Sequence, residues 1–249
     1  KWGSSIYYYL SAVHGIHPSY IQAMLGDGRY DTEQVLSAIT FLKDNTSSSY
    51  SLENMIEALS ISIGSECGSW SAKDWIKGKE VLVIGSGPST KLHIVEIIKY
   101  IEKNQPVVLC LNINQNIPEN LVTSYIACHE TRIAIELDLY ADLTKPIINN
   151  ILSNVDTLDY GLKIEKGNFS AQNNGCILDK PLVLMYALSL LTVSGAKKIS
   201  LTGVDGYKES DPKQQEMISL FDQFISSNRD LNLCAITPSA YPVSQKLIV

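Results

Sequence analysis

The sequence predicts an α/β fold, in which a largely parallel sheet carries helices on both faces and a small all-helical segment precedes it. From about residue 80 onward, short apolar runs alternate with longer segments of helical periodicity. The run Val81-Leu82-Val83-Ile84 is apolar at every position, as in a strand covered on both faces. Strand and helix in alternation require crossover connections, and these favour parallel strands.

The first 64 residues show only helical spacing. Asp31 is a good N-cap for a helix over residues 32–42, and Ser51 opens a second apolar stripe over residues 52–61. A Gly- and Ser-rich stretch follows, and the pattern then changes to strand–helix alternation. We therefore predict a helical segment at 1–64, a linker at 65–78 and a Rossmann-like nucleotide-binding domain at 79–249.

The individual elements of the third part follow from apolar period and turn signals. Strands are expected at Glu80–Ile84, Val107–Asn112, Arg132–Leu137, Thr157–Tyr160, Lys198–Thr202 and Leu231–Ile236. Helices are expected at Lys91–Glu102, Leu143–Leu152, Pro181–Val193 and Pro212–Ser226.

Composition narrows the function classes. The formal net charge of −6 and the lack of a basic cluster argue against nucleic-acid binding. Five scattered cysteines without C-x-x-C spacing argue against a metal cluster or a disulfide framework and favour a reducing compartment. The longest apolar stretch, 181–193, is too short to cross a bilayer. We expect a cytoplasmic protein with no membrane partner, either monomeric or a homo-oligomer, whose start without Met suggests a longer parent chain.

The strongest functional feature is a turn of small residues between the first strand and the following helix. Glycines permit a tight turn and close approach of a ligand, and proline suits the first helical turn. Hydroxyls beside a helix N-terminus, with its free N–H groups, favour an anion such as a phosphate. The residues of this turn are Gly85, Ser86, Gly87, Pro88, Ser89 and Thr90.

The turn differs from the two common nucleotide fingerprints. Thr90 occupies the third glycine position of G-x-G-x-x-G, and amides at Asn112 and Asn114 replace the acidic residue that grips the ribose of NAD. Lys91 lacks the spacing of a Walker lysine. A mononucleotide site is the remaining prediction, with a simple strand–helix connection as the alternative.

Further polar segments follow other predicted strands. Asn112 and Asn114 come after the second strand, where neutral amides suit a base or sugar edge. Asp205 stands between two glycines after the strand 198–202, and it suits a metal, a ribose or a sugar hydroxyl, or alternatively an Asx-turn or helix cap. Asn174 and Gly175 form another polar turn. Ligands bind outside the carboxyl ends of parallel strands, where such segments lie.

These segments carry a resemblance. GSGPS, VVLCLNIN, NNG before a long apolar helix, and ISLTGVDGY follow the order seen in a bacterial sialyltransferase family that uses CMP-sialic acid. The G-x-G-P-S turn is also similar to domains associated with flagellin glycosylation and with pterin pyrophosphokinases. The resemblance implies that the turn faces a nucleotide phosphate or ribose, that Asn112 contacts the nucleotide, and that Asn174 with Gly175 lies near its phosphates.

The catalytic part of that resemblance is incomplete. The transferases carry a histidine after the last motif, whereas this chain has none after His129. Transfer needs a positioned acid–base group, so Tyr207 and Asp205 are the candidates left for that role. The resemblance therefore implies a CMP-type nucleotide or nucleotide-sugar as ligand more strongly than it implies transfer.

The N-terminal segment resembles another family. KWGSSIYYYLSAVHGIHPSYIQAML, followed by DTEQVLSAITFL, is similar to the helical region after the barrel in metal-dependent, pyruvate-linked aldolases of the 4-hydroxy-2-oxovalerate type. The resemblance implies a divalent metal only in a barrel preceding Lys1, and it makes Tyr7 the nearest counterpart of the tyrosine that protonates the aldol oxygen. Packing of Tyr7 with its tyrosine neighbours is the alternative.

Three functional hypotheses follow. The leading one is the C-terminal region of an aldolase-like enzyme of surface-polysaccharide biosynthesis, with a nucleotide- or nucleotide-sugar-binding domain. The second is a sialyltransferase-like glycosyltransferase, and a pyrophosphokinase ranks below it for want of Mg²⁺-binding carboxylates. The third is a non-catalytic regulatory or oligomerising module.

Overall fold

The computed structural model describes residues 67–129, 139–140, 142–150, 156–165, 169–228 and 231–248. The chain divides into two compact units, Lys1–Ile63 with His129–Ala141, and Gly64–Cys128 with Asp142–Val249. The fold below is that of the second unit. The predicted N-terminal helices and the predicted strand at 132–137 lie outside the described residues.

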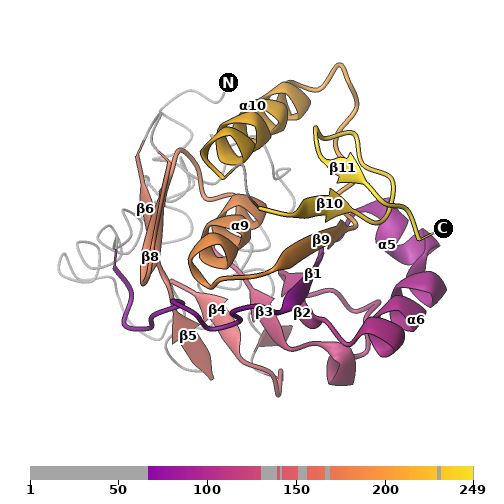
Figure 1. Ribbon diagram of the computed structural model, residues 1–249, viewed down its shortest axis with the longest axis horizontal. Coiled ribbons are helices and arrows are strands. Elements are labelled where there is room, and N and C mark those ends of the chain that lie inside the picture. The colour runs from indigo at the N-terminus through magenta and orange to yellow at the C-terminus, as the bar shows by residue number, and fades with distance from the viewer. Residues whose placement is uncertain are drawn as a thin grey trace, which may run out of the picture. The chain divides into compact units, whose positions relative to one another are not determined.

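The second unit is built on an eight-stranded sheet in which every neighbouring pair is parallel (Figure 1). The order across the sheet is β11-β10-β9-β1-β2-β3-β4-β5, which confirms the predicted α/β, Rossmann-like fold. The chain starts in the middle at β1 and returns to the middle at β9. The strands are β1 (Glu80–Ile84), β2 (Val107–Leu111), β3 (Ser124–Ile126), β4 (Ile147–Asn149), β5 (Thr157–Asp159), β9 (Lys198–Thr202), β10 (Leu233–Ala235) and β11 (Ser244–Gln245).

Helices cover both faces of the sheet. Right-handed crossovers place helices on opposite faces when the chain moves in opposite directions along the sheet. The step from β1 to β2 passes through α5 (Pro88–Leu92) and α6 (Ile94–Asn104), with η1 (Glu119–Leu121) following β2. The step from β9 to β10 runs the other way through α10 (Pro212–Ser227), and α9 (Val183–Val193) leads into β9. The junction of β1 and β9 is thus the point at which the strand order reverses.

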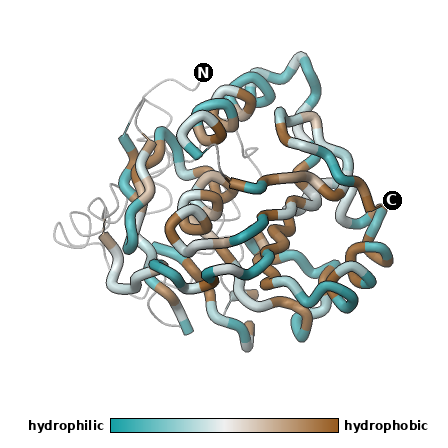
Figure 2. The backbone as a smooth tube through the Cα atoms, viewed as in Figure 1, coloured by the Kyte–Doolittle hydropathy of each residue, from teal (hydrophilic) through white to brown (hydrophobic). Residues whose placement is uncertain are grey.

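The core lies where α9 and α10 pack on one face of the sheet. Alternate residues of β1 and β9 join this cluster, among them Val81, Val83 and Leu201, together with Phe221 of α10. Eight of the eleven residues of α9 are buried, and Figure 2 shows this helix as hydrophobic over most of its length. A helix that is apolar all round belongs in an interior, so α9 is the central element of the core.

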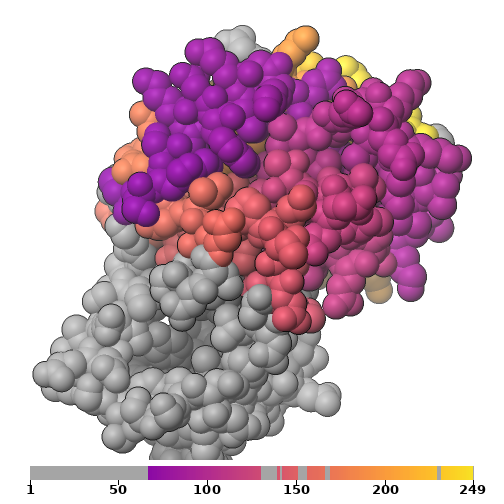
Figure 3. Space-filling view, turned by 90° about the horizontal axis from the view of Figure 1, so that it is seen from below, coloured from indigo at the N-terminus to yellow at the C-terminus, as the bar shows by residue number. Residues whose placement is uncertain are grey.

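A small second sheet and the preceding segment close one side of the unit. The sheet has the order β6-β8-β7, with β8 (Gly175–Leu178) parallel to β6 (Gly161–Ile164) and antiparallel to β7 (Ser170–Gln172). Residues from Cys67 onward lie against it, because Gly68 N–H donates to Asn174 O (2.7 Å). Figure 3 shows this indigo segment beside the orange strands. From residue 67 the stretch predicted as a linker is hydrogen-bonded into the unit.

One predicted helix is wrong. Residues 143–152 were expected to be helical, but Ile147–Asn149 forms β4, which pairs with β3 and β5. Pro146 stands directly before it, where proline disfavours a helix, and two buried β-branched residues fit a strand covered on both faces. The predicted helix 91–102 is instead two helices that meet at His93, whose φ and ψ (−111°, 25°) are not helical.

The structure bears on two of the compositional expectations. In the part of the chain that it describes, no helix is both long and apolar enough to cross a membrane. All five cysteines are free thiols, and four of them are buried. Burial raises the pKa of Cys110 and of Cys176 to about 12, so both remain uncharged.

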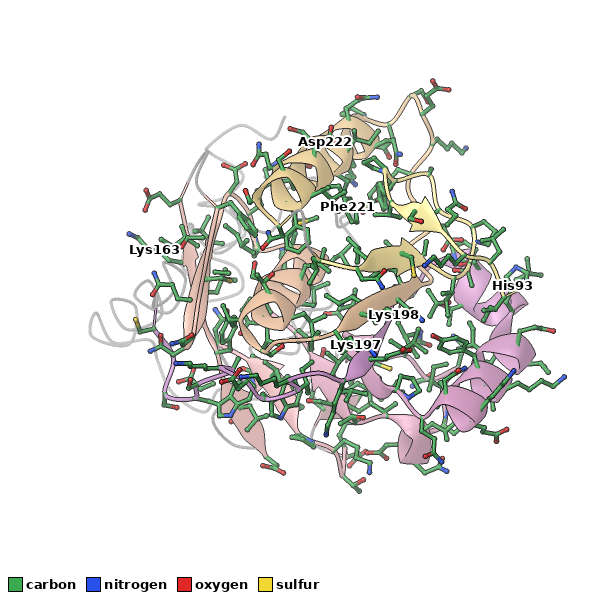
Figure 4. The ribbon with its side chains drawn as sticks, in the orientation of Figure 1. His93, Lys163, Lys197, Lys198, Phe221 and Asp222 are labelled. Atoms are coloured by element: carbon green, nitrogen blue, oxygen red, sulfur yellow. The ribbon has the colours of Figure 1, made fainter. Side chains whose placement is uncertain are left out.

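Phe221 offers a test of the core on α9 and α10. Its side chain is fully buried and packs on Tyr241 with ring centroids 4.9 Å apart, whereas neighbouring Asp222 points outward (Figure 4). We expect Phe221→Ala to lower the free energy of unfolding by about 3–5 kcal/mol, because it leaves a cavity. Urea unfolding followed by circular dichroism measures this. Asp222→Ala is the matched control and should stay within about 0.5 kcal/mol of the parent.

Glu119 predicts a pH dependence. Its carboxylate accepts hydrogen bonds from the backbone N–H (2.7 Å) and the hydroxyl (2.9 Å) of Thr144, and these hold the pKa of Glu119 below its usual value. A lowered folded-state pKa gives stability that is present above the unfolded pKa, near 4.5, and is lost as the pH falls through the folded value. Glu119→Gln should therefore lower the urea midpoint more at pH 7 than at pH 3. Glu102→Gln, on an exposed part of α6, controls for the charge; equal effects at both pH values would contradict the assignment.

Candidate functional site

The ends of β1 and β9 meet at the centre of the carboxyl edge of the sheet. Ile84, the last residue of β1, pairs with Thr202, the last residue of β9, and on its other side with Cys110 of β2. The loops after β1 and β9 then lead to opposite faces. Open parallel sheets bind ligands at such a reversal of strand order, so this junction is the candidate site.

Three glycines allow the two loops to touch. A Cβ on Gly85 would stand 2.4 Å from the carbonyl oxygen of Gly203, and one on Gly203 would stand 1.9 Å from Thr90 Oγ1. Gly203 also has a φ of +65°, which L side chains rarely adopt. A Cβ on Gly87 would lie 2.6 Å from the Gly203 carbonyl oxygen. These positions thus require glycine because two backbone segments approach each other closely. The approaching segment is the loop after β9 of the same protein, rather than a ligand.

The N–H groups of the glycine turn are directed at protein acceptors. Gly85 N–H donates to Thr202 O (2.8 Å) and Gly87 N–H donates to Gly203 O (2.9 Å). Ser89 N–H, in the first turn of α5, donates to the Asp205 carboxylate (3.1 Å). Donors that a bound phosphate would need are therefore already used within the protein.

The two hydroxyls expected at the anion site are buried in the same way. Thr90 Oγ1 donates to the carbonyl oxygen of Gly85 (2.8 Å). Ser89 Oγ lies 3.0 Å from Thr237 Oγ1, and this buried hydroxyl also accepts from Gly203 N–H (3.2 Å). Ser89 thus connects the turn to the loops after β9 and β10, whereas Thr90 closes the turn on itself through Gly85. Ser86 is different: it is exposed, and among the described residues nothing hydrogen-bonds its N–H or hydroxyl.

Asp205 lies directly against the turn. Its Oδ1 accepts from Ser89 N–H, so it caps the start of α5 from a neighbouring loop. Its Oδ2 packs on Gly87, where a Cβ would stand only 1.9 Å away, and although it is buried no residue in the described part of the chain donates a hydrogen bond to it. One half of the carboxylate therefore has a structural role, while the other half is an unsatisfied acceptor.

A buried amide holds the loop that carries Asp205. Gln214 Oε1 accepts from Tyr207 N–H (2.8 Å), and its Nε2 donates to Ala240 O (3.0 Å). Ala240 N–H in turn donates to the Asp205 carbonyl oxygen (2.8 Å). The Tyr207 ring is exposed, with Lys213 Nζ 5.9 Å from its centroid. The loop is thus fixed from α10 and from the loop after β10, and the phenol proposed as an acid lies at the surface.

The two asparagines after β2 take different roles. Asn114 is buried, and its Nδ2 donates to the Gly85 carbonyl oxygen (3.0 Å) while its Oδ1 accepts from Asn116 N–H (3.1 Å). Asn112 has a left-handed φ of 55°, which asparagine tolerates, and this ends β2 one residue earlier than predicted. Its Oδ1 is buried and receives no hydrogen bond. Asn114 therefore supports the turn, whereas Asn112 keeps an unused acceptor.

The predicted site residues do not all come together. The turn 85–90, Asn112, Asn114 and Asp205 meet at the β1/β9 junction. Asn174 forms the turn between β7 and β8, where its carbonyl oxygen accepts from Gly68 and Gly161. Gly161 follows β5, which lies four strands from β1 across the sheet, so Asn174 and Gly175 are remote from the glycine turn. Tyr7 lies outside the described residues.

Unsatisfied acceptors gather on the carboxyl edge of the sheet. Three buried side-chain oxygens there receive no hydrogen bond from any described residue: Asn112 Oδ1 after β2, Asn150 Oδ1 after β4 and Asp205 Oδ2 after β9. Buried polar atoms are nearly always paired, because an unpaired one loses its water without compensation. Three such atoms along one edge make the carboxyl edge of the sheet the candidate binding surface.

The sequence did not reveal several residues of this site. Thr237 follows β10 and Asn150 follows β4 at the carboxyl edge. A polar residue just after a strand is a recognisable signal, but for Asn150 and Thr237 it depends on knowing where β4 and β10 end. Gln214 has no such signal, because it lies on a helix whose sequence indicates only an amphipathic surface element.

The comparisons leave the family open. No protein-family model matches the chain, and a search of curated proteins finds no match either.

Gly87 tests whether the turn requires close packing. We expect Gly87→Ala to destabilise the protein by several kcal/mol, roughly the cost of overpacking a core, because the new Cβ would meet backbone at 2.6 Å. Gly78→Ala is the matched control: Gly78 has a φ of +73° and nothing within 4 Å, so only the backbone conformation is strained, at about 1–2 kcal/mol. Thermal unfolding of both variants measures the difference. A Gly87→Ala variant no less stable than Gly78→Ala would contradict the requirement for close packing at Gly87.

Proposed function

We propose that the second unit, Gly64–Cys128 with Asp142–Val249, forms a nucleotide- or nucleotide-sugar-binding domain whose ligand lies along the carboxyl edge of the sheet at the β1/β9 junction. The observation that carries this is the row of unsatisfied oxygens on Asn112, Asn150 and Asp205. The reversal of strand order at the same place supports it, because ligands of open parallel sheets bind at such points.

The spacing of these oxygens favours an elongated ligand. From β9, which precedes Asp205, to β4, which precedes Asn150, the sheet makes four strand steps. At about 4.8 Å per step this is roughly 19 Å. A free phosphate or a single small sugar would meet only one of the three acceptors. A nucleotide joined to a sugar has several groups in a row and suits the whole edge, which agrees with the resemblance of the GSGPS and GVDGY segments to a CMP-sialic-acid-dependent family.

The wider role rests on the N-terminal resemblance. Residues 1–60 resemble the region after the barrel of pyruvate-linked aldolases, and a nucleotide-sugar domain beside an aldolase would suit an enzyme of carbohydrate biosynthesis. Sugar transfer by the second unit itself is the second candidate. It needs an acid–base group beside the ligand, and Asp205, which borders the glycine turn, is the residue that would have to serve.

Ligand binding is tested by calorimetric titration of the full chain with CMP, UMP, ADP and CMP-sialic acid. We expect at least one to bind with a dissociation constant below 1 mM. Asn112→Ala should weaken that binding by about tenfold, since it removes one hydrogen bond to the ligand. Asn120→Ala, an exposed asparagine in the same connection, is the matched control and should change nothing.

Two outcomes would contradict the proposal. One is that none of the four compounds binds at millimolar concentration. The other is that Asn112→Ala binds as the parent does, which would place the ligand away from the carboxyl end of β2.

A further inference from the structure

The glycine turn has few groups left to bind an anion. Of the N–H groups from Gly85 to Thr90, those of Gly85, Gly87, Ser89 and Thr90 donate to acceptors of the protein, and Pro88 has none. Only Ser86 keeps a backbone donor that no described residue uses. A phosphate cradle needs several convergent N–H groups. Here the negatively charged carboxylate of Asp205 already occupies the position at the start of α5 that a phosphate would take.

The groups that remain unsatisfied at this junction have the opposite character. Asp205 Oδ2 and Asn112 Oδ1 are hydrogen-bond acceptors that lack a donor. An asparagine side chain can present its oxygen or its nitrogen, but an ionised carboxylate accepts only. Asp205 therefore determines which ligand group fits beside it. A phosphate oxygen placed there would be repelled by the negative charge of the carboxylate, whereas a hydroxyl would donate the missing hydrogen bond.

From this we infer that the part of the ligand at the β1/β9 junction is a hydroxyl-bearing ring, a ribose or a sugar, whose hydroxyls donate to Asp205 Oδ2, and that the phosphates lie away from the glycine turn. This rests on the proposed function and reverses the usual orientation of a nucleotide on a glycine-rich turn. Among the described residues no three His, Cys, Asp or Glu side chains come together as metal ligands would. Hydroxyl donors thus suit this site better than a cation does.

Access to Asp205 requires a small movement. Its Oδ2 is closed to water, and Gly87 is the residue that lies against it. Gly87 N–H donates to the Gly203 carbonyl oxygen and the Gly87 carbonyl oxygen accepts from Thr90 N–H, whereas Ser86 is exposed and no described residue hydrogen-bonds its N–H or hydroxyl. The turn can therefore shift at Ser86 and Gly87 while Ser89 and Thr90 stay anchored. Gln214 keeps the Asp205 loop in place from the other side.

The test compares ligands that differ only in these groups. The full chain is titrated with CMP, cytidine, 2′,3′-dideoxy-CMP, CMP-sialic acid and inorganic phosphate. We expect cytidine to bind within about tenfold of CMP, and phosphate at 10 mM not to compete. If the ring is the ribose, the dideoxy compound should bind at least about tenfold more weakly than CMP, because the acceptor is left unpaired.

The variant Asp205→Asn sharpens the comparison. Asparagine keeps an acceptor for Ser89 N–H but replaces the second oxygen by an amide nitrogen, a donor. The variant should bind CMP at least about tenfold more weakly than the parent does, and it should bind the dideoxy compound as tightly as the parent does. If the ring is the sugar instead, the variant should bind CMP-sialic acid more weakly than the parent does and should bind CMP with unchanged affinity. Asp222→Asn on the exposed face of α10 is the matched control (Figure 4).

The possible results distinguish a failure of this inference from a failure of the proposed function. Binding of no compound in the series contradicts the proposed function, and the inference fails with it. Nucleotide binding that inorganic phosphate displaces, or that neither the missing hydroxyls nor Asp205→Asn weakens, overturns the inference alone. The ligand comparison on the parent protein decides this even if the variant is unstable.

Discussion

The approach of two backbones at the ends of β1 and β9 is the constraint on which the carboxyl edge depends. Gly85 and Gly203 lie so close that a Cβ on either would overlap the other loop. From this contact the chain leaves in opposite directions, through α5 and α6 on one face and through α10 on the other. A larger residue at either position would separate the loops and with them the hydroxyls of Ser89 and Thr237, whose hydrogen bond connects them.

The same contact brings a carboxylate to the start of α5. Asp205 follows Gly203 by two residues, so the short distance between the loops places it beside Ser89 N–H. A negative charge at a helix N-terminus is favourable, and the protein supplies that charge itself. This explains how a glycine turn with the outward signs of an anion site can have its donors occupied, and why the unsatisfied atoms nearby are acceptors.

Much of the fold was readable in the sequence because single segments carried unambiguous patterns. The central strands β1, β2 and β9 are apolar runs between turn residues, and α9 and α10 have helical length and period. Ile147–Asn149 was misassigned because three residues form too short a window for a period, and the helical pattern of its flanks dominated. The small sheet of β6, β7 and β8 was missed for a similar reason: its strands are three or four residues long and, apart from β8, only half-buried. Such strands form because a neighbour is present, which no local pattern records.

The sequence by itself determined that a glycine turn, two asparagines and an aspartate would follow strands of a parallel sheet, because residue type and strand order are local properties. It also singled out Gly85 and Gly87, for a tight turn and the approach of a ligand, whereas the close neighbour in the structure is the Gly203 loop. Only the tertiary structure decided which of these polar groups form hydrogen bonds with one another. Ser89 finds Asp205 116 residues away and Thr237 148 residues away, and Asn174 is carried to the far side of β5. Hydrogen-bond pairing across such separations depends on how the strands are ordered in space, and that order left Asp205 Oδ2 and Asn112 Oδ1 without a hydrogen bond from any described residue.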